Sequence, residues 1–186
     1  MVMTASPRPR LGISSCLLGQ AVRYDGGHKR DPFCVDLLGP LVEWVPVCPE
    51  VEAGMPIPRP SIRLTGRSEA PHLVAGATGE DWTGRMEALA SRRVEELARL
   101  GLDGYVTKQD SPSCGLNGVL VQPLEGGPPR RDGVGAFVRV LTGRLPLLPI
   151  EEEGRLHDPL VRQRFVERIF AHAAERSRRA VGGSGG

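Results

Sequence analysis

Residues 83–107 read TGRMEALASRRVEELARLGLDGYVT and join a long amphipathic segment to a short apolar one. In residues 83–100 the apolar side chains recur at the spacing of an α-helix, and Gly101 stands where a helix end favours glycine. Gly104–Thr107 is a short run of the kind that forms a buried strand. This stretch therefore predicts a helix that leads into a strand, which is half of a β-α-β crossover.

Similar segments lie on both sides of this stretch. We expect strands or strand pairs at residues 11–15, 42–47, 62–64 with 72–75, 118–122 and 145–150. Strands that alternate with helices favour right-handed crossovers. The sequence therefore predicts an α/β fold with a mostly parallel sheet and helices on both faces, a Rossmann-like arrangement of three layers.

Three further helices are expected, together with one segment without regular structure. Asp31–Leu38 begins with an N-cap residue and a proline, and Asp132–Leu141 has one apolar face. A last helix begins at Asp158-Pro159, and its expected buried side chains are Leu160, Val161, Phe165, Ile169 and Phe170. Residues 49–60 contain four prolines, which predicts an ordered loop.

Length and charge limit the function classes. The 186 residues suit one domain, which we place at residues 11–180, between a flexible leader (1–10) and a flexible glycine-rich tail (181–186). A net charge of +2 and an aromatic content of 4% argue against an RNA-binding surface. No signal peptide or membrane-spanning stretch is visible, so we expect a cytoplasmic protein with reduced cysteines.

Three of the four cysteines directly follow expected strands or their exit loops, namely Cys16, Cys48 and Cys114. Parallel strands end at one edge of a sheet, where α/β proteins bind their ligands. Three thiolates without a fourth suit an iron–sulfur cluster or a metal ion with an open position, and a thiol nucleophile is a further alternative. Cys34 lies inside an expected helix and is interpreted as a buried core thiol.

The segments around these cysteines allow two interpretations each. Ser111–Gly115 (SPSCG) brings the backbone close to a bulky ligand, or forms a tight turn around a buried thiol. Glu50, two residues after Cys48, is a proton-transfer group or a surface carboxylate. Residues 23–29 (RYDGGHK) can hold an anion or a polar heterocycle, although they lack the spacing of a phosphate-binding loop. No histidine stands at zinc-ligand spacing from a cysteine, so no structural zinc site is expected.

Five motifs in this order resemble a bacterial and archaeal family whose characterised members are thiouracil desulfidases. They are CLLG (16–19), VRYDGG (22–27), VCPEV (47–51), PRP (58–60) and SPSCG (111–115). The C-terminal GRL (154–156) and FVERIF (165–170) are also similar to that family. The resemblance extends from about Leu11 to Ala171.

The resemblance implies a 4Fe–4S cluster held by Cys16, Cys48 and Cys114, with one iron free of protein ligands. It also implies non-redox desulfuration of thiolated pyrimidines: the open iron binds the substrate sulfur, water attacks the ring carbon, and hydrosulfide leaves. The expected partner is a small thiolated nucleobase or nucleoside.

Within this scheme, we assign residues to two roles by hypothesis. Catalysis is assigned to Glu50, Ser113 and Lys108, and substrate binding to Ser15, Asp25, Arg59 and Ser111. The alternative function is an iron–sulfur or metal protein that acts in sulfur trafficking or redox sensing without desulfidase activity.

Overall fold

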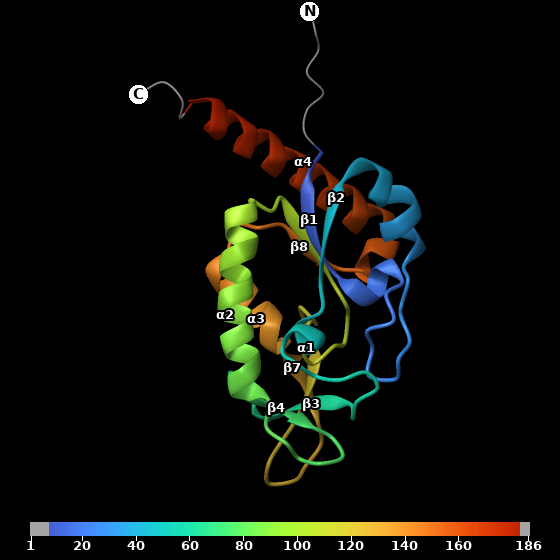
Figure 1. The fold of residues 1–186 in the computed structure, drawn as a ribbon, viewed down its shortest axis with the longest axis vertical. Coiled ribbons are helices and arrows are strands. Elements are labelled where there is room, and N and C mark those ends of the chain that lie inside the picture. The colour runs from blue at the N-terminus through green and yellow to red at the C-terminus, as the bar shows by residue number, and fades with distance from the viewer. Residues whose placement is uncertain (1–7, 183–186) are drawn as a thin grey trace, which may run out of the picture.

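The computed structural model describes residues 8–182, which form two four-stranded sheets with helices around them (Figure 1). The first sheet is parallel, in the order β2-β1-β5-β8. Its strands are β1 (Arg10–Ser14), β2 (Glu43–Val47), β5 (Gly104–Thr107) and β8 (Ile150–Glu152). The predicted α/β fold with a parallel sheet is therefore confirmed.

The second sheet is mixed, which the sequence analysis did not predict. Its order is β4-β3-β6-β7, with strands β3 (Ile62–Arg67), β4 (Ala70–Ala75), β6 (Val119–Gln122) and β7 (Arg130–Gly133). β3 and β6 are parallel, whereas the β3–β4 and β6–β7 pairs are antiparallel. The expected hairpin is present, and its strands extend to Arg67 and back from Ala70 because the turn occupies only two residues.

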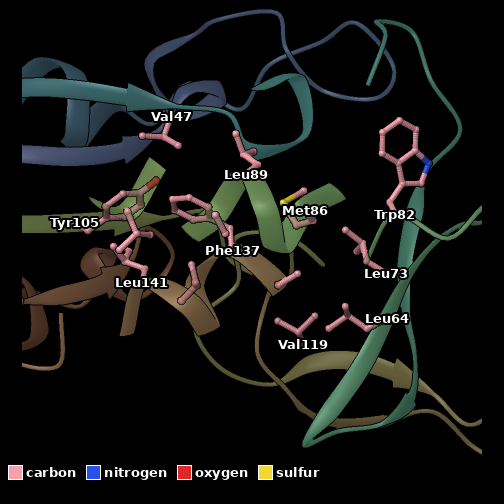
Figure 2. Packing of buried hydrophobic residues seen from close by; sticks show 14 of the residues in the cluster. Val47, Leu64, Leu73, Trp82, Met86, Leu89, Tyr105, Val119, Phe137 and Leu141 are labelled. Carbon is pink, nitrogen blue, oxygen red and sulfur yellow. The ribbon is translucent and has the colours of Figure 1, made fainter. Parts of the chain in front are cut away.

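Helices cover both faces of the parallel sheet. α2 (Thr83–Leu100) and α3 (Ala136–Arg144) pack together on one face, and α4 (Pro159–Gly182) lies on the other (Figure 1). Side chains alternate along β5, so Tyr105 joins the core under α2 and α3 while Val106 joins the core under α4. Figure 2 shows that the first core also includes Leu64 and Leu73 of the second sheet, so this core joins the two sheets.

Several element boundaries agree with the prediction. The helix at Thr83–Leu100 is confirmed, and Gly101 ends it in the left-handed conformation with a φ of 69°. The short helix after Asp31 forms as a π-helix at Phe33–Leu38, and the Cys34 amide donates to the Asp31 carboxylate at 2.9 Å. A 3₁₀ turn at Gly39–Leu41 directly follows this helix.

Other boundaries were wrong. Asp132 belongs to β7, and the helix expected from that residue begins at Ala136. The strand expected at 145–150 forms at Ile150–Glu152, because Pro146 and Pro149 supply no amide to a strand ladder. Residues 49–60 include a helical turn, α1 (Pro49–Glu52), since proline is well tolerated as the first residue of a helix.

The last helix buries only part of its predicted face. Phe165 and Ile169 are buried in the core, whereas Leu160 and Phe170 are exposed. The proposed leader and tail fall mainly outside the described residues, although Arg10 opens β1 and α4 continues to Gly182. Within residues 8–182, no helix has the length and apolar character needed to cross a membrane.

Candidate active site

The three cysteines line one cavity of about 320 Å³ at the carboxyl ends of β1, β2 and β5. Strand register brings these ends level, since Ser14 pairs with Val47 across β1 and β2, and Ile13 pairs with Val106 across β1 and β5. Cys16 follows in a 3₁₀ turn (Ser15–Leu18), and Cys48 directly precedes α1. The parallel topology therefore places thiols from distant parts of the chain around one space.

Cys114 is held by a network of backbone and hydroxyl hydrogen bonds. The Ser111 hydroxyl oxygen accepts from the amides of Ser113 (3.3 Å) and Cys114 (3.1 Å). The first amides of α3 donate to the same turn, with Phe137 reaching the Ser113 carbonyl at 3.0 Å. A Cβ on Gly135 would lie 2.6 Å from the Ser113 carbonyl group, so this approach needs glycine. The SPSCG segment forms a tight turn with a buried thiol, and this turn also lines the cavity.

All four cysteines are free thiols, and burial disfavours their ionisation. Burial and the neighbouring Cys48 raise the pKa of Cys16 to about 11. Burial also raises the pKa of Cys48, and burial, Glu50 and the other two thiols raise the pKa of Cys114 well above its ordinary range. The mutual influence of the three thiols agrees with their position around one cavity.

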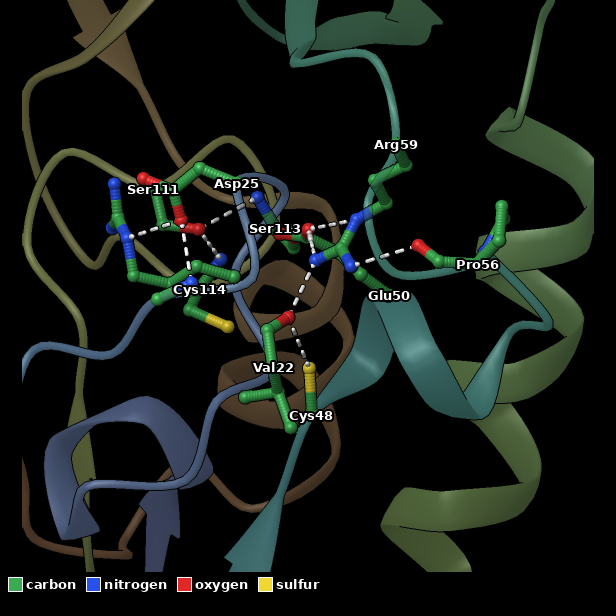
Figure 3. Close-up of polar contacts among 11 residues, drawn as sticks. Val22, Asp25, Cys48, Glu50, Pro56, Arg59, Ser111, Ser113 and Cys114 are labelled. Atoms are coloured by element: carbon green, nitrogen blue, oxygen red, sulfur yellow. Dashed lines mark hydrogen bonds and ion pairs between the residues drawn. The ribbon is translucent and has the colours of Figure 1, made fainter.

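Glu50 has a fixed carboxylate at the cavity wall (Figure 3). The Ser113 hydroxyl donates to Oε1 at 2.5 Å, and the guanidinium of Arg59 contacts Oε2, with Nε at 3.0 Å. Arg59 is buried and also donates to the carbonyls of Val22 and Pro56, at 2.9 Å and 3.2 Å. Each oxygen of the Glu50 carboxylate therefore has a hydrogen-bond donor, and both donors, Ser113 and Arg59, are buried side chains.

Lys108 supplies a cation to another wall of the cavity. Its ammonium donates to the carboxylate of Glu153 at 2.5 Å and to the Gln109 carbonyl at 2.9 Å. Its amide donates to the Ser14 hydroxyl at 3.0 Å, which ties the end of β5 to the end of β1. Lys108 also acts electrostatically on Cys16, lowering a pKa that burial raises.

The structure brings together most, but not all, of the predicted site residues. The cavity is lined by Cys16, Cys48, Cys114, Glu50, Lys108, Ser15, Arg59 and Ser111. Ser113 is fully buried and reaches the cavity only through its hydrogen bond to Glu50. Asp25 does not line the cavity: its carboxylate accepts from the Gly27 amide at 2.9 Å and pairs with Arg23 at 3.6 Å, which shapes the loop.

Sequence reasoning missed several polar residues at the site. Ser14 is buried at the end of β1 and lines the cavity, but it reads as one more residue of an apolar strand. Glu152 and Glu153 are also buried, and Glu152 accepts from the amides of Leu116 (2.8 Å) and Asn117 (3.2 Å), just after Cys114. They belong to the acidic run EEE at residues 151–153. Such a run is typical of a solvent-exposed segment, so the sequence does not predict that two of its side chains are buried.

The donor set of the cavity fits a group that is bound through sulfur. The three cysteines line the space, together with Ser14, Ser15 and Ser111. In residues 8–182, no three His, Cys, Asp or Glu side chains are arranged to hold a single metal ion. Three thiolates around a space of this size are the ligands expected for a polynuclear cluster with one metal position left open.

Comparison with known proteins identifies the family. The family model described as 2-thiouracil desulfurase matches residues 11–153. The chain belongs to this family. The match contains all three cavity cysteines and ends at Glu153, so it spans the whole lining of the cavity.

Two individual proteins are similar to this member of the 2-thiouracil desulfurase family. The structure of a 4Fe–4S-dependent thiouracil desulfidase, TudS, matches with a TM-score of 0.66 and 30% identity, covering 81% of this chain and 95% of that one. The uncharacterized protein YbbK of Bacillus subtilis (strain 168) is 29% identical over an alignment of 108 residues, which covers 55% of this chain and 71% of YbbK.

Proposed function

We propose that this chain is a cluster-dependent desulfidase that removes the sulfur of a thiolated pyrimidine, a small base or nucleoside, without net electron transfer. The observation that carries the proposal is the cavity itself, in which three free thiols and one fixed carboxylate face the same space. Membership of the 2-thiouracil desulfurase family and the likeness to TudS support it.

Cys16, Cys48 and Cys114 are the residues that would hold the cluster. When bound through three thiolates, a 4Fe–4S cluster supplies an iron without a protein ligand, which is a Lewis acid for a thiocarbonyl sulfur. Cys34 takes no part, because it is fully buried in the core beneath α4 and does not line the cavity.

Glu50 would move the proton in this reaction. The reaction breaks a carbon–sulfur bond and forms a carbon–oxygen bond with water, so the two protons of water end on the departing sulfur or in solvent. Ser113 and Arg59 hold the two carboxylate oxygens, which fixes the Glu50 carboxylate in the cavity wall. A general base that is fixed in this way takes a proton from water as the water attacks the ring carbon.

The remaining cavity residues would bind the substrate. Lys108 offers an ammonium group, while Ser15 and Ser111 offer hydroxyl groups to the polar edge of a pyrimidine. Asp25 has no such role in this proposal, because it organises the loop outside the cavity.

Glu50→Gln is expected to lower the rate of sulfide release from 2- or 4-thiouracil by about 10² or more, because general acid–base catalysis contributes factors of that order. Sulfide and uracil are measured with anaerobically reconstituted protein, alongside Glu95→Gln on the exposed face of α2 as the matched control. Cluster-loaded wild type that releases no sulfide would refute the desulfidase function and favour sulfur trafficking or redox sensing. A Glu50→Gln variant with normal turnover would remove only Glu50 from the mechanism.

The fraction of protein that holds a cluster is expected to increase as the pH rises. The raised pKa values of Cys16, Cys48 and Cys114 keep these thiols protonated near neutral pH, and each must lose its proton to become a ligand. Loading therefore releases protons, and the cluster occupancy reached with limiting iron and sulfide should increase between about pH 6 and 9. Occupancy is measured from the optical spectrum and the iron content, and occupancy independent of pH would contradict this ligand set.

We also infer a reducing location such as the cytoplasm. The four free thiols support this inference, since buried cysteines that serve as ligands must escape oxidation.

A further inference from the structure

The chain contains only two lysines, Lys29 and Lys108, among its 24 basic residues, and both line the cavity. Lys108 is held far more tightly, because its ammonium contacts both Glu153 and the Gln109 carbonyl. Only 20% of the Lys108 side chain is exposed. Fixing the long Lys108 side chain in one conformation costs conformational entropy, so its contacts must offset that cost.

Glu153 is the residue that fixes Lys108. Its Oε1 accepts from the Lys108 ammonium at 2.5 Å, and its Oε2 accepts from the Gln109 amide at 2.6 Å. The Glu153 side chain is 10% exposed, so this carboxylate has exchanged most of its water for these two donors. Glu153 thus holds the backbone and the side chain of one short segment at once.

The fold places Glu153 at this point through strand pairing. β8 pairs with β5 up to Thr107 and Glu152, and the Glu153 amide then donates to the Thr107 carbonyl at 3.1 Å. A Cβ on the next residue, Gly154, would lie 2.0 Å from Oε1 of Gln109, so a larger residue there would require the Gln109 side chain to move.

We propose that Glu153 is a positioning residue of the active site, which holds the Lys108 ammonium on the cavity wall beside Cys16. The ammonium has three N–H donors, and Glu153 and Gln109 accept two of them, which leaves one for a ligand in the cavity. The chemical class of that ligand is a hydrogen-bond acceptor, the thiocarbonyl or carbonyl edge of a pyrimidine. The nature of this ligand rests on the proposed function, whereas the placement of Lys108 does not.

The placement is tested by lysine labelling, which needs neither cluster nor turnover. Folded protein is treated briefly with an acylating reagent, and the modified fractions of Lys108 and Lys29 are compared by peptide mass spectrometry. Glu153→Gln is expected to raise the Lys108-to-Lys29 ratio about threefold or more, because the ammonium loses its charged partner. Glu151→Gln, in β8 two residues before Glu153 and paired with Arg155, should leave the ratio unchanged. An unchanged ratio in folded Glu153→Gln would overturn the proposal.

The effect on the reaction is tested by a double-mutant cycle with the cluster-loaded enzyme. Glu153→Gln is expected to lower kcat/KM about tenfold, a size typical of coupled charged residues in contact. In a Lys108→Met background, the same substitution should have almost no further effect, since Glu153 acts through Lys108. Fully additive losses would overturn the proposal, and thermal melting confirms that each variant is folded. Wild type that is cluster-loaded but inactive would refute the desulfidase function, while the labelling result still decides the placement of Lys108.

Discussion

Replacing Cys16, Cys48 or Cys114 singly by alanine is expected to abolish stable cluster binding and sulfide release, whereas Cys34→Ala should retain both. The three thiols line one cavity, and Cys34 lies in a separate, fully buried position in the core beneath α4. A cluster held by these three thiolates would lose one of its three protein ligands with each substitution. Cys34→Ala removes only a small buried group, so it should lower the free energy of unfolding without affecting the cluster.

The measurement combines iron and sulfide content with the optical spectrum after anaerobic reconstitution. Cys34→Ala is the matched control, since it removes the same atom from the same protein at a place outside the cavity. A normal cluster in any of the three cavity variants would show that this cysteine is not a ligand. Loss of the cluster in folded Cys34→Ala would contradict the assignment of Cys34 to the core.

Asp103→Asn is expected to lower the free energy of unfolding by about 3 kcal/mol, because it removes the charge from a fully buried carboxylate that pairs with a cation. Asp103 lies just before β5 and has no exposed surface. Arg176 of α4 donates to both of its oxygens, at 2.9 Å and 2.8 Å, and the Arg10 amide donates at 2.9 Å. His172 lies 3.3 Å from the same carboxylate. The residue therefore joins β1, β5 and the last helix.

Denaturant unfolding of the cluster-free protein measures this effect. Asp36→Asn is the matched control, since Asp36 pairs with Arg30 on the exposed surface and should contribute less than about 1 kcal/mol. Equal effects of the two substitutions would show that the buried contacts of Asp103 add no stability of their own.

The stability that Asp103 provides should also depend on pH. Burial alone would raise its pKa, but the hydrogen bonds from Arg176 and Arg10 outweigh burial and hold the pKa below its ordinary range. A carboxyl whose pKa is lowered by folding stabilises the protein above its unfolded pKa of about 4. This contribution is lost as the pH falls through the folded pKa, so the difference between wild type and Asp103→Asn should shrink in acid.

The sequence predicted the parallel sheet and its ligand-binding edge because both depend on local patterns. Buried parallel strands appear as apolar runs, and the residues that follow them must lie at one edge. The motifs around Cys16, Cys48 and Cys114 then indicated which chemistry to expect. These parts of the fold and the site needed no knowledge of tertiary contacts.

The second sheet and the supporting residues could not be predicted, because they depend on partners far away in the chain. β7 is mostly exposed and polar, with two arginines and an aspartate, so it carries no apolar signal. Glu153 is separated from Lys108 by 45 positions in the chain, and nothing near either residue indicates their ion pair. Asp25 is the opposite case, since its motif suggested a binding residue but its carboxylate contacts Gly27 and Arg23 of its own loop and does not line the cavity.

The strand order of the parallel sheet determines how the three thiols come together. β1 lies between β2 and β5, so the segments that carry Cys16, Cys48 and Cys114 are neighbours through the pairing of β1 with both strands. In the unfolded chain, more than half of the sequence separates the first of these thiols from the last. A cofactor that contacts all three thiols at once therefore requires the native pairing of β1 with both β2 and β5.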